Sequence, residues 1–315
     1  MNEGPITVDP EMVQALADGS SALMAIEGVT GFDIGLDDDG ASSLRIMVAD
    51  LSDVPADVPD SLAGWPVHVI QRNPSLFSVP PDDGFYPEVV GGIEVARGTT
   101  GVLSHAPGTL GCVLRDSQNG LAPVGVSCAH VLAGIDPFAI FYDDEIWQPN
   151  RAGYRVGRLR RWEIPTTPSW NPGGFPSGFW DAAVCTMDRS AAVGEIADIG
   201  TLSGIASVRG VMQSVRKRGC TTRLTHGLVS GMFGSILFSH PGHATAWWMI
   251  GQMEIVATND PDLNPDGFAQ PGDSGSVVVD EDNQVVGLLH GGDAASGIGY
   301  ASDFAPLAVA LGVTI

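Results

Sequence analysis

A glycine-flanked serine near the C-terminal end of the sequence has the setting that a nucleophilic hydroxyl needs. Gly272-Asp273-Ser274-Gly275-Ser276 runs directly into three valines, so the serine is expected on a tight turn that enters a buried strand. Glycines on both sides permit unusual backbone angles and leave room for a substrate, and the N–H groups of such a turn can converge on a developing oxyanion. An ordinary glycine-rich turn explains the pattern too, because short motifs recur by chance.

A serine nucleophile needs a base and an acid that orients the base, and the sequence offers a candidate for each. His130 follows a predicted strand over Pro123–Ser127 and is flanked by small residues, as a base at the mouth of a cleft would be. Asp181 opens the run Asp181-Ala182-Ala183-Val184-Cys185, which turns apolar at once. Taken singly, each residue is better explained by a structural role. Together with Ser274 they predict a catalytic triad.

Composition indicates a β-rich protein with enough apolar sequence for a sizeable core. Of its 315 residues 44% are hydrophobic and only 17% charged, while 41 glycines and 22 prolines supply many turns. The formal net charge of −22 argues against nucleic acid or an anionic membrane as a partner. The one basic cluster, Arg216-Lys217-Arg218, is expected on a solvated strand edge or in internal salt bridges.

The cysteines and the N-terminus both favour the cytoplasm. The first residues carry Glu3, Asp9 and Glu11 without a basic start or a long apolar run, which is unlike a secretory signal. A secreted protein would need a signal outside this sequence, and no run is long enough to span a membrane. The cysteines lack the close pairing of a zinc site, and catalysis by a serine nucleophile needs neither a metal nor an organic cofactor, so none is expected. They are Cys112, Cys128, Cys185 and Cys220.

Cys112 and Cys128 lie almost symmetrically about Asn119-Gly120, a strong hairpin turn signal. The two cysteines are therefore expected to be neighbours across two strands. Paired thiols fit a reducing compartment, and a disulfide beside His130 is the alternative.

The first 80 residues differ in pattern from the rest and predict a small α/β leader domain over residues 1–80. Asp9 and Pro10 predict the start of a short helix that ends before Gly19. The turn predicted at Asp37-Asp38-Asp39-Gly40 separates the first two strands, and the proline-rich stretch from Asn73 to Pro87 is typical of a linker. The predicted strands cover residues 28–34, 44–48 and 67–70.

From about Val89 onward, short strands alternate with Gly, Asn and Asp turns, which predicts β-barrels or a sandwich. Two six-stranded antiparallel barrels would fit: residues 81–200, with His130 and Asp181, and residues 201–315, with Ser274. A cleft between the barrels would unite the three side chains. The segment Pro165–Gly178 is expected to be a long surface loop.

Residues about 90–315 resemble the trypsin/chymotrypsin superfamily of serine peptidases, whose chymotrypsin has the same chain order of His, Asp and Ser. More closely, the chain is similar to bacterial trypsin-like peptidases related to the plant Narrow leaf protein family, whose leader domain the N-terminal unit also resembles. Arg223 departs from the glycine expected after Thr222. The matching pieces are Cys128-Ala129-His130, Asp181-Ala182-Ala183, Gly272-Asp273-Ser274-Gly275, Gly108-Thr109-Leu110-Gly111-Cys112 and Arg216-Lys217-Arg218-Gly219-Cys220-Thr221-Thr222.

The resemblance implies a chymotrypsin-like fold and a role for each catalytic position. Ser274 would be the nucleophile, and His130 would be the general base and then the general acid. Asp181 would fix the tautomer of His130. The backbone N–H groups of Gly272 and Ser274 would form the oxyanion hole.

The resemblance also implies substrate-binding positions. The base of the primary pocket would lie six residues before the serine, at Phe268. Because Phe268 is uncharged, an apolar or small side chain is expected before the cleaved bond, although Asp266 or Asp293 could reach the pocket. His290 fits an ordinary strand histidine equally well. The returning strand Val286–Gly292 would line the substrate backbone at His290, Gly291 and Gly292.

The sequence as a whole predicts a serine endopeptidase that cleaves polypeptides through an acyl-enzyme intermediate. Two alternatives stay open: a non-hydrolytic binding module on the same scaffold, and a latent protease controlled by its N-terminal domain or a regulatory protein partner. Val89-Val90-Gly91-Gly92 resembles an N-terminus released on activation, whose amine would pair with Asp273. A turn that joins the leader to the first barrel explains the same residues.

Overall fold

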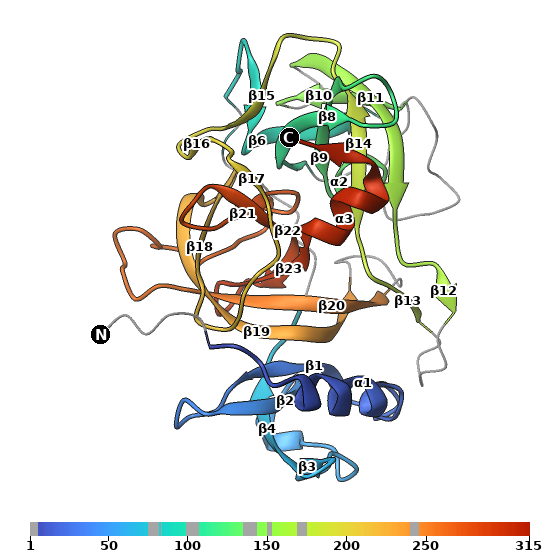
Figure 1. The fold of residues 1–315 in the computed structure, drawn as a ribbon, viewed down its shortest axis with the longest axis vertical. Coiled ribbons are helices and arrows are strands. Elements are labelled where there is room, and N and C mark those ends of the chain that lie inside the picture. The colour runs from blue at the N-terminus through green and yellow to red at the C-terminus, as the bar shows by residue number, and fades with distance from the viewer. Residues whose placement is uncertain are drawn as a thin grey trace.

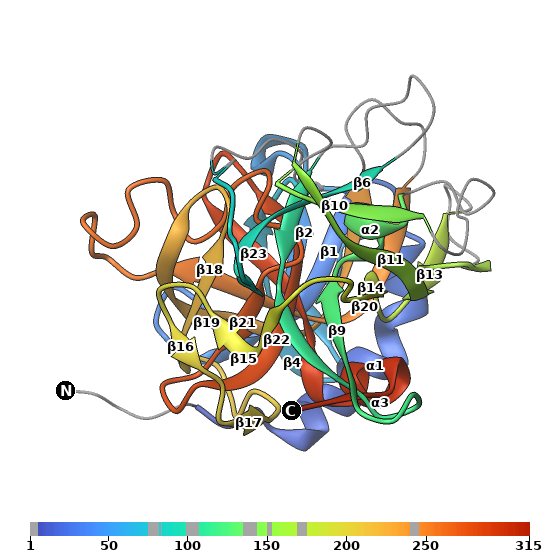
Figure 2. The same ribbon diagram turned by 90° about the horizontal axis from the view of Figure 1, so that it is seen from above.

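Two β-barrels and a smaller N-terminal layer follow one another along the long axis of the molecule (Figure 1). Seen from above, the three layers overlap, with the first barrel nearest the viewer (Figure 2). The computed structural model describes residues 6–74, 82, 84–98, 107–134, 144–149, 153–168, 175–239 and 246–315. Strands dominate these residues, as predicted for a mainly β protein, and no helix among them is long and apolar enough to cross a membrane.

The first barrel is built from β6 (Ile93–Gly98), β7 (Gly108–Leu110), β8 (Cys112–Asp116), β9 (Ala122–Ser127), β10 (Glu145–Gln148), β11 (Tyr154–Glu163) and β14 (Ala182–Thr186). Its pairing order is β8-β9-β14-β11-β10-β6-β7. Only Gly111 separates β7 from β8, so the two act as one bent strand and close a ring of six in this described part. The Asn119-Gly120 turn joins β8 to β9, as predicted.

The second barrel is built from β18 (Ser214–Gly219), β19 (Arg223–Ser239), β20 (Ala246–Ala257), β21 (Val277–Val279), β22 (Gln284–Asp293) and β23 (Ile298–Asp303). The pairing order is β20-β23-β22-β21-β18-β19, and β19 pairs back onto β20. These six described strands therefore close a second ring. The prediction of two six-stranded barrels is confirmed.

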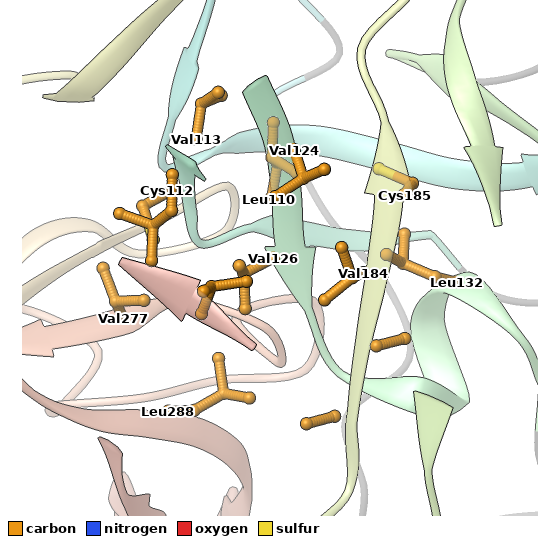
Figure 3. Packing of buried hydrophobic residues seen from close by; sticks show 14 of the residues in the cluster. Leu110, Cys112, Val113, Val124, Val126, Leu132, Val184, Cys185, Val277 and Leu288 are labelled. Atoms are coloured by element: carbon orange, nitrogen blue, oxygen red, sulfur yellow. The ribbon is translucent and has the colours of Figure 1, made fainter. Parts of the chain in front are cut away.

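Buried side chains join the two barrels into one packing unit. The core of the first barrel, which includes Leu110, Val126 and Val184, continues into Val277 and Leu288 of the second (Figure 3). The helix α3 (Phe304–Leu311) adds its apolar face to the same cluster. The hydrophobic effect therefore holds the barrels together, and close packing of the shared core fixes their relative position.

All four cysteines are buried free thiols, so the thiol alternative is confirmed for Cys112 and Cys128. Cys112 pairs with Val126 in the β8–β9 register, two residues before Cys128. Burial raises the pKa of Cys185 and of Cys220 to about 12. Such thiols are poor nucleophiles at neutral pH.

The N-terminal layer contains the predicted helix and strands. They are α1 (Pro10–Met24), β1 (Val29–Leu36), β2 (Ser42–Val48), the short helix η1 (Leu51–Asp53), β3 (Ser61–Leu62) and β4 (Trp65–Gln71). Asp9 caps α1 by accepting the Glu11 N–H at 2.8 Å, but the predicted end before Gly19 is wrong. A side-chain carbon at Gly19 would lie 2.7 Å from Leu62 Cδ2, so this glycine permits close packing on β3 instead of ending the helix.

The strands of the N-terminal layer continue the sheet of the second barrel. β1 pairs antiparallel with β19, with Gly31 opposite Ile236, and β2, β4 and β3 follow it in the same sheet among the described residues. Helix α1 and the first strands share a buried cluster with Trp248 of β20. The layer is thus packed onto the second barrel, while the boundary predicted at residue 80 stays a prediction.

A buried ion network reinforces this attachment. Arg45 of β2 donates to both carboxylate oxygens of Asp33, at 2.8 and 2.6 Å, and reaches Glu254 of β20 at 3.1 Å. Arg72 donates to Glu254 at 2.8 Å. Against the effect of burial, Arg45 and Arg72 lower the pKa of Glu254 to about 2, so this interior carboxylate is ionised.

Short elements complete the chain. The prediction of a surface loop over Pro165–Gly178 is wrong for part of the segment, because Pro176–Gly178 is a strand that pairs in parallel with the long strand β20. Without this pairing, that stretch of the edge of β20 would have no partner. Residues 169–174 lie outside the described residues, as does most of the predicted linker from Asn73 to Pro87. The short elements are β5 (Val89–Gly91), α2 (Ala129–Leu132), β12 (Thr167–Pro168), β13 (Pro176–Gly178), β15 (Ala191–Ile196), β16 (Gly200–Thr201), β17 (Gly204–Ile205) and β24 (Val313–Thr314).

Candidate active site

His130 and Asp181 are in direct contact within the first barrel. His130 lies on the single turn α2 that follows β9, and Asp181 immediately precedes β14, which pairs with β9. Asp181 Oδ2 lies 2.5 Å from His130 Nδ1, and Oδ1 accepts the backbone N–H of His130 at 3.0 Å. Burial alone would raise the pKa of Asp181, but the charge and hydrogen bonds of His130 hold it below its usual value.

The second ring nitrogen of His130 is left available. Because a carboxylate only accepts hydrogen bonds, Asp181 requires the neutral ring to carry its proton on Nδ1. Nε2 then presents a lone pair, and it has no hydrogen-bond partner among the described residues. A positioned imidazole with a free Nε2 is what a general base for a hydroxyl requires.

Ser274 lies on the predicted tight turn before β21. Gly272 and Gly275 have φ angles of +101° and +96°, a region that side chains rarely adopt. A side-chain carbon at Gly275 would lie only 2.1 Å from Ser127 Oγ. The turn therefore needs its glycines, as the motif predicted. The Ser274 hydroxyl donates to the His290 carbonyl at 2.9 Å.

One carbonyl joins the segments that carry the histidine and the serine. Leu289 O accepts the Cys128 thiol at 3.2 Å and the Gly275 N–H at 2.7 Å. Cys128 is two residues before His130, and Gly275 directly follows Ser274. The first and second barrels thus bring these two segments onto the same oxygen atom.

Strand β7 lies between the same two segments. The Thr109 N–H donates to the Ser274 carbonyl at 2.8 Å. A side-chain carbon at the preceding Gly108 would lie 2.5 Å from Val131 Cγ2 and 2.9 Å from Ser274 O. The residue after His130 and the backbone of Ser274 therefore flank a single glycine, which leaves no room for a larger residue between them.

Two backbone N–H groups at the serine have no hydrogen-bond acceptor among the described residues. Asp273 N–H donates to Gln270 O at 3.0 Å and Gly275 N–H to Leu289 O, whereas the N–H groups of Gly272 and Ser274 have no acceptor among the described residues. These are the two donors that the sequence predicted for the oxyanion hole. Free, preorganised donors at this point can stabilise a negative oxygen bonded to the carbon that Ser274 attacks.

The carboxylate of Asp273 is fixed by an internal cation. Lys217 Nζ lies 3.0 Å from it, with both side chains fully buried, and the N–H groups of Thr221 and Thr222 donate to it at 3.0 and 3.1 Å. Burial lowers the pKa of Lys217, and the charge of Asp273 opposes that shift. Val89 is itself buried in β5, where its N–H donates to the Ser190 carbonyl at 3.1 Å. This favours a connection to the first barrel over a released N-terminus, although the connection is a strand and not the predicted turn.

The basic cluster is an internal source of salt bridges, one of the two predicted alternatives. Besides Lys217, Arg218 is buried and lies 2.7 Å from Asp82. Arg223, where a glycine was expected, has a φ of +61° and also pairs with Asp82. The turn thus has the backbone conformation that favours glycine, and an ion pair holds the arginine there.

Replacing Lys217 by methionine should lower the free energy of unfolding by about 3–5 kcal/mol, because the Asp273 carboxylate would stay buried without its cation. Urea unfolding followed by tryptophan fluorescence measures this change. The double variant Lys217→Met/Asp273→Asn should recover most of the loss, since no uncompensated charge remains. A single variant as stable as the wild type would contradict the importance of this pair.

The predicted substrate positions lie along the second barrel. Phe268 is fully buried in the core of that barrel, with Lys217 Nζ 5.7 Å from its ring centre. Gly291 and Gly292 lie on β22, opposite Tyr300 and Gly299 of β23. His290 is fully buried, and its carbonyl accepts the Ser274 hydroxyl. The pocket role of Phe268 and the backbone roles of residues 290–292 stay predictions.

Cys128, His130 and Asp181 also form a possible metal-binding group. Their sulfur, nitrogen and oxygen ligand atoms lie within 4.8 Å of one another, a donor set that zinc accepts. Burial raises the pKa of the Cys128 thiol well above its usual value, and the thiol already donates to Leu289 O. A metal would have to displace this bond and the His130–Asp181 contact, so the arrangement favours proton transfer over metal binding.

Comparisons with known proteins found matches among solved structures. No protein-family model and no curated protein matches the chain. Among solved structures, it is similar to the chymotrypsin of Cellulomonas bogoriensis, with 16% identity and a TM-score of 0.47 over 72% of this chain and 98% of the other. It is also similar to a glutamic acid specific serine protease, with 18% identity and a TM-score of 0.49 over 72% of this chain and 100% of the other. For protease A of Thermobifida fusca the identity is 16% and the TM-score 0.45, over 72% of this chain and 97% of the other.

The two closed six-stranded barrels, with the candidate site at their boundary, give this chain the chymotrypsin-like fold that the sequence predicts. The relation to the Narrow leaf family stays a prediction. Whether the chain hydrolyses peptides depends on its own residues.

Proposed function

We propose that the chain is a serine endopeptidase in which Ser274 is the nucleophile, His130 the base and Asp181 the residue that orients the base. The observation that carries the proposal is the His130–Asp181 contact, which commits Nδ1 to the carboxylate and leaves Nε2 free. The shared Leu289 carbonyl supports it, because it holds the histidine and serine segments together.

Catalysis would begin with a change in the hydrogen bond of Ser274. At rest the hydroxyl donates to the His290 carbonyl, and rotation about the Cα–Cβ bond would redirect it toward His130 Nε2. Ser274 Oγ then bonds to the scissile carbonyl carbon as its proton moves to Nε2. Asp181 stabilises the imidazolium, and the N–H groups of Gly272 and Ser274 donate to the oxyanion.

The same groups complete the reaction. The tetrahedral intermediate collapses as the His130 imidazolium gives its proton to the leaving amine, which leaves an acyl ester on Ser274. A water molecule then attacks the ester carbonyl while His130 takes its proton. As the ester bond breaks, His130 gives that proton to Ser274 Oγ, which restores the hydroxyl and releases a carboxylic acid.

A fluorophosphonate probe should label the full chain covalently at Ser274, because phosphonylation needs an activated hydroxyl and an oxyanion site. Mass spectrometry of the labelled peptide locates the modified serine. His130→Ala should abolish the labelling, whereas Ser203→Ala at an exposed serine should leave it intact. Folded wild-type protein that stays unlabelled after long incubation, both alone and with a polypeptide substrate added, would refute the proposal and support the non-hydrolytic binding module.

The resting contact of Ser274 with the His290 carbonyl favours one variant of this function, a latent enzyme that must be switched to the active rotamer. The rate of labelling separates the two cases. A latent enzyme should react slowly with the probe until a protein partner or a substrate is added, and a constitutive enzyme should react at its full rate alone.

A further inference from the structure

A single buried glutamine makes hydrogen bonds toward both halves of the candidate site. Gln252, on β20, donates from Nε2 to the carbonyls of Phe179 at 3.0 Å and Ile250 at 2.7 Å. Its Oε1 lies 2.7 Å from His290 Nε2 and accepts the Ser302 hydroxyl at 2.8 Å. Gln252 is 1% exposed, so its amide is committed to four partners inside the protein.

The Phe179 bond anchors the segment that carries Asp181. This segment runs along the second barrel as β13, where Ser177 pairs with Trp248, before it enters the first barrel as β14. Phe179 is two residues before Asp181, and its carbonyl lies 3.4 Å from Ser302 Oγ, whose single proton is donated to Gln252 at the shorter distance of 2.8 Å. The Gln252 amide therefore ties this segment to the second barrel just before the carboxylate.

The His290 bond anchors the residue that holds the serine hydroxyl. The carbonyl of His290 accepts Ser274 Oγ at 2.9 Å. The register between β22 and β23 shifts between Leu289 and Gly291, which marks an irregularity of the ladder at His290. Because residues at such irregularities are less firmly fixed by backbone pairing, the side-chain bond to Gln252 gains importance for the position of His290.

The hydrogen-bond partners of Gln252 determine both the orientation of its amide and the tautomer of His290. Since Nε2 of Gln252 faces two carbonyls, its Oε1 must face His290, and the ring must donate from Nε2–H. Burial lowers the pKa of His290 to about 4, with Asp181 and His130 as the titratable groups that face it. The ring is therefore neutral near pH 7, and its bare Nδ1 has no partner among the described residues.

We propose that Gln252 is a positioning residue that sets Asp181 and Ser274 relative to each other, through the Phe179 carbonyl on one side and the His290 ring on the other. This inference rests on the proposed peptidase function. Gln252 contacts neither the reacting hydroxyl nor the base. Its effect comes from alignment across the two barrels, where a misplacement of about 1 Å can lower a rate by about 10²-fold.

Gln252→Leu should lower kcat by about 10²-fold while KM changes by less than about threefold, because alignment and not substrate binding is lost. Gln252→Glu keeps the shape but removes both N–H donors, and it should lower kcat similarly. Gln213→Leu is the matched control. Gln213 is 2% exposed, lies just before β18 and accepts the Arg209 N–H at 2.6 Å, so its loss should affect stability without a fall in kcat.

A kcat for Gln252→Leu within about twofold of the wild type would overturn the proposal. So would an equal loss of kcat in Gln213→Leu, which would indicate a general effect of core damage. If neither Gln252 variant folds, imidazole nitrogen NMR of the wild type still decides. His290 should show the Nε2–H tautomer with a slowly exchanging proton, and an Nδ1–H tautomer would refute the geometry.

The two proposals can fail separately. A wild-type protein that neither cleaves peptides nor reacts with the fluorophosphonate refutes the peptidase function, whatever the tautomer of His290. An active wild type whose Gln252 variants keep their kcat refutes only the positioning role.

Discussion

Ser274→Ala should reduce turnover of a peptide substrate by about 10⁶-fold, the loss seen when a triad nucleophile is removed elsewhere. The variant has no side-chain oxygen to form the acyl ester, and His130 then has no hydroxyl proton to accept. The free backbone N–H groups at positions 272 and 274 would still polarise a carbonyl, so residual hydrolysis of about 10³–10⁴ over water is expected. Hydrolysis of a mixed fluorogenic peptide library by the full chain measures the change.

The stability of the same variant provides its control. Ser274→Ala removes one hydrogen bond, the bond to the His290 carbonyl, which contributes about 0.5–1.5 kcal/mol. Urea unfolding should therefore show a folded protein. The double variant His130→Ala/Ser274→Ala should be no slower than Ser274→Ala, because the two residues act as a unit. Activity near the wild-type rate in Ser274→Ala would show that another group is the nucleophile.

A chain that starts at Val89 should fail to fold into a stable domain. It lacks β1, the partner of β19, and exposes the cluster around Trp248. It also lacks Arg45 and Arg72, which leaves the ionised Glu254 in the interior without its cations. Loss of one partner of a buried pair costs about 3–5 kcal/mol, and whole domains are stable by about 5–15 kcal/mol. Circular dichroism should show no cooperative thermal transition.

The same truncation carrying Glu254→Gln separates charge from packing. The amide removes the carboxylate charge that has lost its cations, but it does not restore strand β1 or the cluster around Trp248. The stability of the truncated chain should therefore recover only in part. In the full chain, Glu254→Gln should keep the protein folded. A truncated chain that folds and cleaves faster than the full chain would instead identify residues 1–88 as a detachable inhibitor.

Local patterns were sufficient for the residues whose roles depend on their immediate neighbours. The turn around Ser274 was predictable because two glycines and a following valine strand leave few conformations open. His130 and Asp181 were predictable as a strand-end turn and a strand start. The structure adds their direct contact, which arises because β9 and β14 are paired. The two barrels followed from the spacing of short strands and turns.

Features that depend on distant partners were not predictable from local patterns. Gln252 belongs to a strand with no motif, and its partners lie up to 73 residues away in sequence. Gly19 looked like a helix end until Leu62 of β3 was seen to pack against it. The strand pairings of β1 with β19 and β13 with β20 depend on edges that only the folded barrel presents. Hydrophobic periodicity indicates that a strand exists but does not specify its neighbour.

The Lys217–Asp273 pair bears on how the activity of such an enzyme would be regulated. The cation that neutralises Asp273 is supplied by β18, so the loop bearing the nucleophile acquires its shape in the same event that forms the second barrel. No chain cut is needed to deliver a charge to that carboxylate. Control over an enzyme of this design would therefore act on the intact folded chain, through the polypeptides and partners that reach it, and not through cleavage of the chain.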